Sequence, residues 1–481
     1  MHWQGTNLMN KNSFQLSMLI VCFSILSGCS SFNRSEFEMP TVEIPSHWQQ
    51  ESNDVTSPAL LDEWWKQFNN PQLNSLIESA LQTNNDLVLA TLTLRKARLK
   101  AGLSEDDKLP DLSFSGAFSK EKSFASDDTD TDTDTDNSYG TTTSLSYDLD
   151  LWGQLSAAAD ATQWAAQASF EDRESTAQAL VVTVASLYWK IGYLNQRISI
   201  AESNIKGIEQ IIVLTKYRYD NGSTTQLSVL ESTQNRYKQQ VSLSQLQQQL
   251  TESKNALVML LNQPQQVAML SIEKLPEGEL PDIASGIPGD LLLRRPDVRS
   301  SLYQLKSMLA SKDALDASYF PSLTLTAELG TSSSDLVELL QNPIGKLGTE
   351  LTLPFLNWNK MKLNKNISEL DYQTAVINYR VTLYQAFEEV ANYIEAKANF
   401  HYQGETQQAQ YSNAQEVEKI YASKYSAGAI DMIDWINAIE AKRDAQASLL
   451  ENHYNQFVIQ AKLYQSLGGT DIAPKIQSNS N

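Results

Sequence analysis

The stretch Lys108-Leu-Pro-Asp-Leu-Ser-Phe-Ser115 returns, roughly two hundred residues later, as Tyr319-Phe-Pro-Ser-Leu-Thr-Leu-Thr326. A second pair of similar segments, Tyr219-Asp-Asn-Gly-Ser223 and Tyr425-Ser-Ala-Gly-Ala429, has a comparable separation. Similarity at a fixed long period indicates that the chain contains two copies of one structural unit. After each proline, apolar and polar residues alternate, which predicts a strand with one apolar face.

Each copy is predicted to contain one strand pair followed by two long helices. Alternating runs that lead to Trp152 and Trp358 extend the strand pairs over about 111–152 and about 321–358. The stretches that follow are rich in Ala, Gln, Glu and Lys, contain no proline, and run through a Tyr-x-x-Gly turn to Gln263 or Gly468. Proline would interrupt a helix, so its absence permits outgoing helices of about sixty-five residues, on the order of 100 Å long.

Composition agrees with an elongated helical protein, because glycine and proline are sparse. Helices of this length bury their apolar stripe mainly against neighbouring helices. The formal net charge is −20, and no cluster of Lys and Arg is visible in the sequence. Nucleic-acid binding needs such clusters, so a nucleic-acid partner is not expected.

The N-terminal segment resembles a bacterial lipoprotein signal. Lys11 precedes the apolar run Met18-Leu-Ile-Val-Cys-Phe-Ser-Ile-Leu26, which leads to Leu26-Ser-Gly-Cys29. This order predicts a removed signal peptide, residues 1–28, and the resemblance implies a covalent lipid on Cys29. Ser30 takes the place of the aspartate that retains such proteins at the inner membrane, which favours the outer membrane. The alternative is an ordinary secretory signal or a membrane anchor, for which the apolar run is short.

The strands can then be interpreted as membrane-crossing segments. Outer membranes are spanned by closed β-barrels, which start at about eight strands, so four strands per chain are too few. Three copies would supply twelve strands and twelve long helices around a pore. A dimer is possible on counting alone, but side chains would fill its lumen. Alternatively, the strand pairs are soluble hairpins that cap a coiled coil.

The chain resembles the outer membrane efflux protein family, the TolC-like outer membrane factors, and within it the lipoprotein branch that serves RND pumps. The sharpest motif is Ile287-Pro-Gly-Asp-Leu-Leu-Leu-Arg-Arg-Pro-Asp-Val298, and the resemblance runs from Trp64-Trp65 to Gly468-Gly469. It implies a mixed α and β fold, mostly α: a trimeric 12-stranded transmembrane β-barrel with four strands per chain, continuous with a long periplasmic α-helical barrel, plus a small equatorial region. The expected divisions are 1–28 signal, 29–70 N-terminal arm, 71–263 first repeat, 264–289 linker, 290–467 second repeat and 468–481 tail.

The implied function is passive conduction through the outer membrane, without enzymatic chemistry, of substrates delivered by a periplasmic adaptor (membrane fusion) protein and an inner-membrane RND transporter. The four histidines are scattered, and no catalytic motif, metal site or cofactor site other than the lipid on Cys29 is expected. Alternatives are the exit duct of a type I secretion or metal efflux system and, in another class, a lipid-anchored trimeric coiled-coil scaffold or adhesin.

The Tyr-x-x-Gly turns hold the candidate gate, because the resemblance places them at the periplasmic entrance. Gly222 and Gly428 are expected to have positive φ angles, which end one helix and allow the next to begin. Beyond the second turn, Asp431 and Asp434 are three residues apart and are expected on one helical face. The next acidic position expected from the family is Asn437 in this chain, and the first-repeat residues that correspond to Asp434 and Asn437 are Ser228 and Glu231. The alternative is that these carboxylates merely complement the helix dipole.

Two other charged segments have structural interpretations. Arg294 and Arg295, beside Asp290 and Asp297, are predicted to form ion pairs that lock the repeat junction, although contacts to an adaptor are the alternative. The repetitive acidic segment 127–136 lacks the glycine and glutamate of a calcium loop, so it is interpreted as a solvated extracellular loop.

Overall fold

The computed structural model describes residues 34–42, 63–122, 135–263, 271–278, 280–281, 294–468 and 471–474. The predicted signal peptide, Cys29, Asp290 and segment 127–134 of the acidic loop lie outside these residues.

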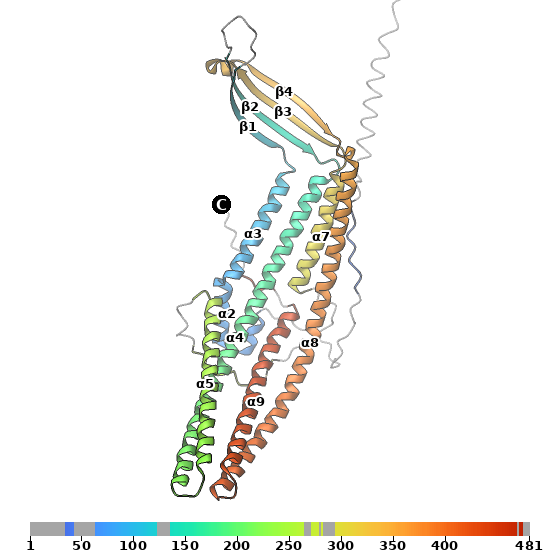
Figure 1. The fold of residues 1–481 in the computed structure, drawn as a ribbon. Helices are drawn as coiled ribbons and strands as arrows, with labels where there is room; N and C mark the ends of the chain where they lie inside the picture. Colours follow the sequence, from blue (N-terminus) through green and yellow to red (C-terminus); the bar gives the residue numbers. More distant parts are fainter. Residues whose placement is uncertain are drawn as a thin grey trace, which may run out of the picture. The chain divides into compact units, whose positions relative to one another are not determined.

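The doubled unit appears as one series of elements that occurs twice (Figure 1). The elements are η1 (Trp64–Phe68), α2 (Pro71–Thr83), α3 (Asn85–Asp106), β1 (Asp111–Lys122), β2 (Thr135–Leu149), α4 (Gln154–Asp220), α5 (Gln226–Leu260), α7 (Pro296–Ala317), β3 (Ser322–Ser333), η3 (Leu336–Gln341), β4 (Pro343–Thr352), η4 (Pro354–Leu356), α8 (Trp358–Ser426) and α9 (Met432–Ser466). A helix, two strands, a very long helix and a returning helix recur in this order.

The long helices are confirmed. The outgoing helices α4 and α8 have 67 and 69 residues, and the returning helices α5 and α9 have 35 residues each. No helix in the described part of the chain is both long enough and apolar enough to cross a membrane.

The chain divides into two compact units, each assembled from separate segments. The first contains the sheet and is formed by the described residues within 1–40, 95–168 and 301–379. The second contains the helix turns and is formed by the described residues within 41–94, 169–300 and 380–481. Both units take segments from both sequence repeats, because the long helices contribute to both.

The sheet of the first unit is antiparallel, with strand order β1-β2-β3-β4. Its register sorts side chains by polarity, because directly opposed residues share a face and successive residues alternate between faces. One cross-strand row consists of Leu112, Leu145, Ala327 and Leu347. The next row, on the other face, consists of Ser113, Ser144, Glu328 and Lys346. The sheet therefore has one apolar and one polar face, and its apolar leucines are exposed in the single chain.

The largest core belongs to the second unit and is built around tryptophans. Trp189 of α4 is fully buried between Phe68 and Phe457, with ring centroids 5.0 and 5.2 Å away. Trp64 stacks on Tyr464 at 5.1 Å. This core joins η1, α4 and α9, so residues from both repeats depend on it.

Gly192 lets the chain after α5 cross α4 at close range. A Cβ atom at this position would lie 2.8 Å from the carbonyl carbon of Lys274. Leu275, the next residue, is buried in the tryptophan core. The described part of the predicted linker, 264–289, therefore contributes to the packing of the second unit.

Candidate functional site

The two predicted turn glycines end the long helices in the same way. Gly222 has φ 66° and Gly428 has φ 74°, which confirms the expected positive angles. Beyond Gly222, the Ser223 N–H donates to the Arg218 carbonyl at 2.8 Å. Beyond Gly428, the Ala429 N–H donates to the Lys424 carbonyl at 2.9 Å. Both are Schellman caps, in which a glycine in the left-handed conformation satisfies the last helix carbonyls.

The candidate gate carboxylates of the second repeat, Asp431 and Asp434, are exposed next to the second turn. Asp431 has an extended backbone and occupies the N-cap position of α9, without a side-chain capping bond. The expectation of a shared helical face was therefore wrong for Asp431, whereas Asp434 lies in the first turn. Within the described residues, no hydrogen bond or ion pair joins either carboxylate to another side chain. A carboxylate at Asp434 is favoured by the dipole of α9 and remains available to solvent and ions.

The first repeat differs at the matching positions. The Ser228 hydroxyl lies 3.2 Å from that of Thr224, and Glu231 is half-buried on α5. Asn437 is exposed on α9. The acidic character next to the turns is therefore uneven between the repeats.

A contact that the sequence did not predict joins the ends of α4 and α8. The Arg218 guanidinium lies 4.4 Å from the centre of the Tyr425 ring and donates to the carbonyls of Tyr425 and Ser426, at 3.2 and 3.3 Å. Tyr425 is buried and stacks on Trp435 at 5.2 Å. One arginine thus satisfies the last carbonyls of the other long helix and covers an aromatic face.

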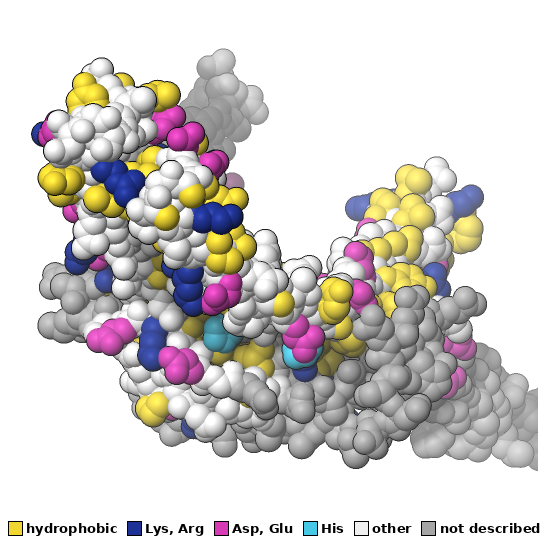
Figure 2. Space-filling view, turned by 90° about the horizontal axis from the view of Figure 1, so that it is seen from below, with side chains coloured by type: hydrophobic (Ala, Val, Ile, Leu, Met, Phe, Trp, Pro, Cys, Tyr) yellow, Lys and Arg dark blue, Asp and Glu magenta, His cyan; other side chains and the backbone are white. Residues whose placement is uncertain are grey.

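Two further polar contacts tie the helices near the turns. Glu418 of α8 accepts hydrogen bonds from the Trp435 indole at 3.1 Å and from Lys442 at 3.3 Å. Lys238 of α5 pairs with Glu440 of α9 at 2.9 Å. The two helical hairpins of one chain are therefore joined to each other. Figure 2 shows basic and acidic side chains interspersed on the visible face.

Only one side of the Arg218 contact could be recognised in the sequence. A basic residue in the last helical turn suggests that it binds helix carbonyls. The carbonyls that Arg218 binds belong to the other repeat, and no spacing within one helix identifies them.

The predicted junction arginines have different surroundings. Arg295 is buried and forms a two-bond contact with Asp297, at 3.0 and 2.7 Å. It also pairs with Glu389 at 2.8 Å and donates to the Ser466 carbonyl. Arg294 forms no ion pair with any residue that the structure describes.

Comparison with known proteins identifies the family. The sequence pattern of the outer membrane efflux protein family matches residues 76–263 and 287–469, one stretch in each repeat. The chain is 29% identical over 461 residues to the toxin and drug export protein A of Aggregatibacter actinomycetemcomitans, covering 95% of this chain and 98% of that protein. It is 27% identical over 465 residues to the probable outer membrane lipoprotein SilC of Salmonella typhimurium, covering 95% and 99%.

The fold matches that of a solved channel. The Campylobacter jejuni CmeC outer membrane channel has a TM-score of 0.83 at 21% identity, over 92% of this chain and 96% of that one. The predicted mixed, mostly helical architecture is confirmed. Because the family pattern covers both repeats, the chain belongs to the outer membrane efflux protein family.

Proposed function

We propose that this protein is the outer-membrane exit channel of a tripartite efflux system. It would passively conduct substrates that an inner-membrane RND transporter and a periplasmic adaptor deliver to the end of the helices where the turns at Gly222 and Gly428 lie. The observation that carries the proposal is a four-stranded sheet with one apolar and one polar face, whose strands β1 and β4 each pair on one side only within the described residues. Such a sheet needs other copies to close its edges in lipid.

Exposed apolar side chains on the helices attached to the edge strands support closure by three chains. On α8, which follows β4, they recur with heptad spacing at Leu363, Ile367, Leu370 and Ile377. On α3, which leads into β1, they include Leu99 and Leu103. Stripes with this spacing are buried when helices of neighbouring chains pack side by side. A homotrimer would close twelve strands and bury both stripes.

The N-terminal arm supports lipid attachment at Cys29. Ser35 donates from its backbone N–H and its hydroxyl to Asp313, at 3.0 and 2.7 Å, and Arg34 pairs with Asp160. Arg34 follows Cys29 by five positions, so the lipid would lie within about 18 Å of that arginine. An anchor of this reach would keep the protein in the outer membrane with its helices in the periplasm. On this proposal the protein needs no enzymatic site and no cofactor.

Conductance in planar lipid bilayers tests the proposed function directly. The purified full-length lipoprotein is expected to form trimers that resist dissociation in detergent and to conduct ions across the bilayer. Trimers that give no conductance with adaptor present or absent would overturn the channel proposal and favour a lipid-anchored scaffold.

Replacing Asp434 by asparagine tests the candidate gate. Three copies of Asp434 around a narrow axis would create a negative potential that attracts cations. We expect D434N to reduce the preference of the channel for cations and its block by multivalent cations. The matched variant N437D adds a carboxylate one turn along α9 and should increase both. Unchanged selectivity in both variants would show that these positions serve only the helix end.

A further inference from the structure

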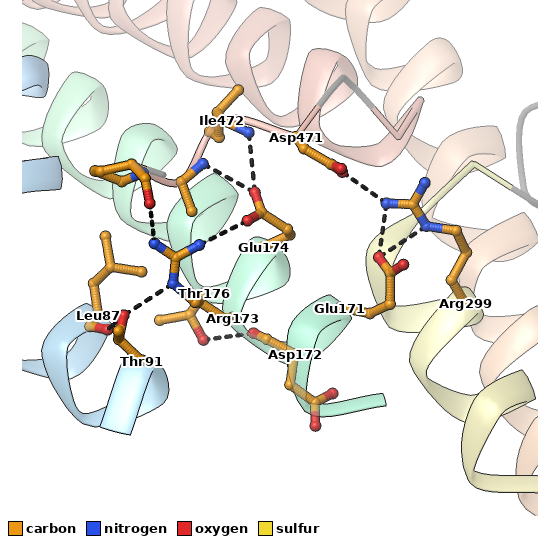
Figure 3. Close-up of polar contacts among 12 residues, drawn as sticks. Leu87, Thr91, Glu171, Asp172, Arg173, Glu174, Thr176, Arg299, Asp471 and Ile472 are labelled. Atoms are coloured by element: carbon orange, nitrogen blue, oxygen red, sulfur yellow. Dashed lines mark hydrogen bonds and ion pairs between the residues drawn. The ribbon is translucent and has the colours of Figure 1, made fainter. Parts of the chain in front are cut away.

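The residues that follow α9 are held against α4 by a cluster of buried charged side chains (Figure 3). Glu174 accepts hydrogen bonds from the backbone N–H groups of Ile472, at 3.0 Å, and Ala473, at 2.9 Å. Arg173 donates to the carbonyl of Pro474. Segment 471–474 is thus bound through its backbone, by side chains of a helix far away in the sequence.

Arg173 also joins this cluster to α3. Its guanidinium pairs with Glu174 at 3.0 Å and donates to the Thr91 hydroxyl at 2.9 Å. Both Arg173 and Glu174 are almost completely buried, with 4% and 1% of their surfaces exposed. Buried charges are stable only when paired and hydrogen-bonded, so the tail backbone is part of what satisfies them.

A second ion pair ties the same segment to α7. Arg299 lies between Glu171 and Asp471, at 2.7 and 2.9 Å. Glu171 is buried, whereas the Asp471 side chain is half-exposed. The groups facing Glu171 are therefore Arg299 from α7, Asp471 from the tail and Glu174 from α4 itself.

Among the residues that the structure describes, this cluster has more carboxylates than guanidiniums. Glu171, Glu174 and Asp471 face Arg173 and Arg299, which leaves one excess negative charge when all five are ionised. Burial raises the pKa of Glu171 to about 7, although the Arg299 charge opposes this shift. Burial also raises the pKa of Glu174. A buried site with one excess negative charge favours binding of a proton.

We propose that α4, Arg299 and segment 471–474 form a proton-dependent clasp, in which Glu171 holds a proton while the tail is bound and loses it as the tail is released. The clasp is a regulatory device of the fold and does not depend on the proposed conduction. It would couple the attachment of the C-terminal tail to the pH around the helices.

The direction of the pH effect follows from the raised pKa of Glu171 and from the Asp471 charge, which adds to this shift and leaves with the tail. A carboxyl with a higher pKa in the bound state binds its proton more tightly there than after release. Its contribution to clasp stability is complete below its ordinary pKa of 4.5 and is lost as the pH rises through about 7. On the proposed clasp, Glu171 returns to its ordinary pKa of 4.5 when the tail is released, and the equilibrium constant for tail attachment then falls about tenfold between about pH 6 and about pH 8.5.

Hydrogen exchange in the full-length trimer tests the clasp. The protection factors of the Ile472 and Ala473 amides, corrected for intrinsic exchange, are expected to fall about tenfold over that pH range. E171Q removes the titrating group, so protection should no longer change with pH. The control D172N neutralises the adjacent carboxylate, which accepts a hydrogen bond from Ser300 rather than from the tail, and should keep the wild-type dependence.

Two outcomes would overturn the proposal. Equal protection of the wild-type tail at both pH values would show that the clasp does not respond to protons, and this result needs no variant. A tenfold fall in the amide protection factors that persists in E171Q would assign the titration to another group. A melting curve at the lower pH establishes whether E171Q is folded, so that a folding defect is not mistaken for tail release.

Discussion

Replacing Ile367 by lysine is expected to convert most of the protein from trimer to monomer while leaving the single chain folded. Ile367 is exposed in the centre of the α8 stripe, so the chain itself loses little packing. On the proposed assembly the side chain is buried against a neighbouring copy, and its loss costs about 2 kcal/mol at each of three interfaces. Placing an ammonium group there adds a desolvation cost. Analytical ultracentrifugation in detergent would measure the shift.

The control for this prediction is lysine at Gln373, an exposed polar position at the edge of the same face of α8. Q373K should remain trimeric, and I367L, which keeps the apolar surface, should also assemble. A trimer of I367K as resistant to heat and detergent as the wild type would contradict packing through this stripe.

Replacing Trp189 by alanine should be the most destabilising change in a single chain. The substitution opens a cavity between Phe68 and Phe457, where the core joins segments from both repeats. Large aromatic residues in such positions contribute about 3–5 kcal/mol to the free energy of unfolding. The temperature at which the helical circular dichroism signal is lost on heating would measure this destabilisation.

Phenylalanine at the same position provides a matched comparison. Within the described residues, the Trp189 indole N–H has no hydrogen-bond partner, so W189F removes volume but breaks no polar contact. We expect W189F to cost about 1–2 kcal/mol, well below the alanine variant. Equal losses of unfolding free energy in W189A and W189F would mean that the indole itself, rather than the volume it fills, stabilises the core.

The sequence predicted those parts of the fold that depend on local pattern. Each strand pair has two alternating runs, and the long helices follow from proline-free stretches that Gly222 and Gly428 divide into an outgoing and a returning helix. Periodicity and the breaking residues act within a few turns of the chain, so they can be recognised without knowledge of distant partners. The register of β2 with β3 joins the two repeats, and no local pattern specified it.

The polar sites were less predictable, because their partners are far apart in sequence. Arg295 and Asp297 are neighbours and could be paired from the sequence, whereas Glu389 could not. The contacts of Glu174 with Ile472 and Ala473 go to backbone amides, which carry no sequence signal. The burial of Glu174, which makes its contacts important, depends on tertiary packing.

The contacts between the two hairpins determine how many parts of the proposed assembly could move independently. Arg218 links α4 to α8, and the Lys238–Glu440 pair links α5 to α9, always within one chain. A trimer would therefore have six turns but only three mechanically separate bodies. A force applied by a partner at one turn would be transmitted to the second turn of the same subunit. The entrance would then widen by the movement of three bodies, one for each subunit, rather than by independent movement of the six turns.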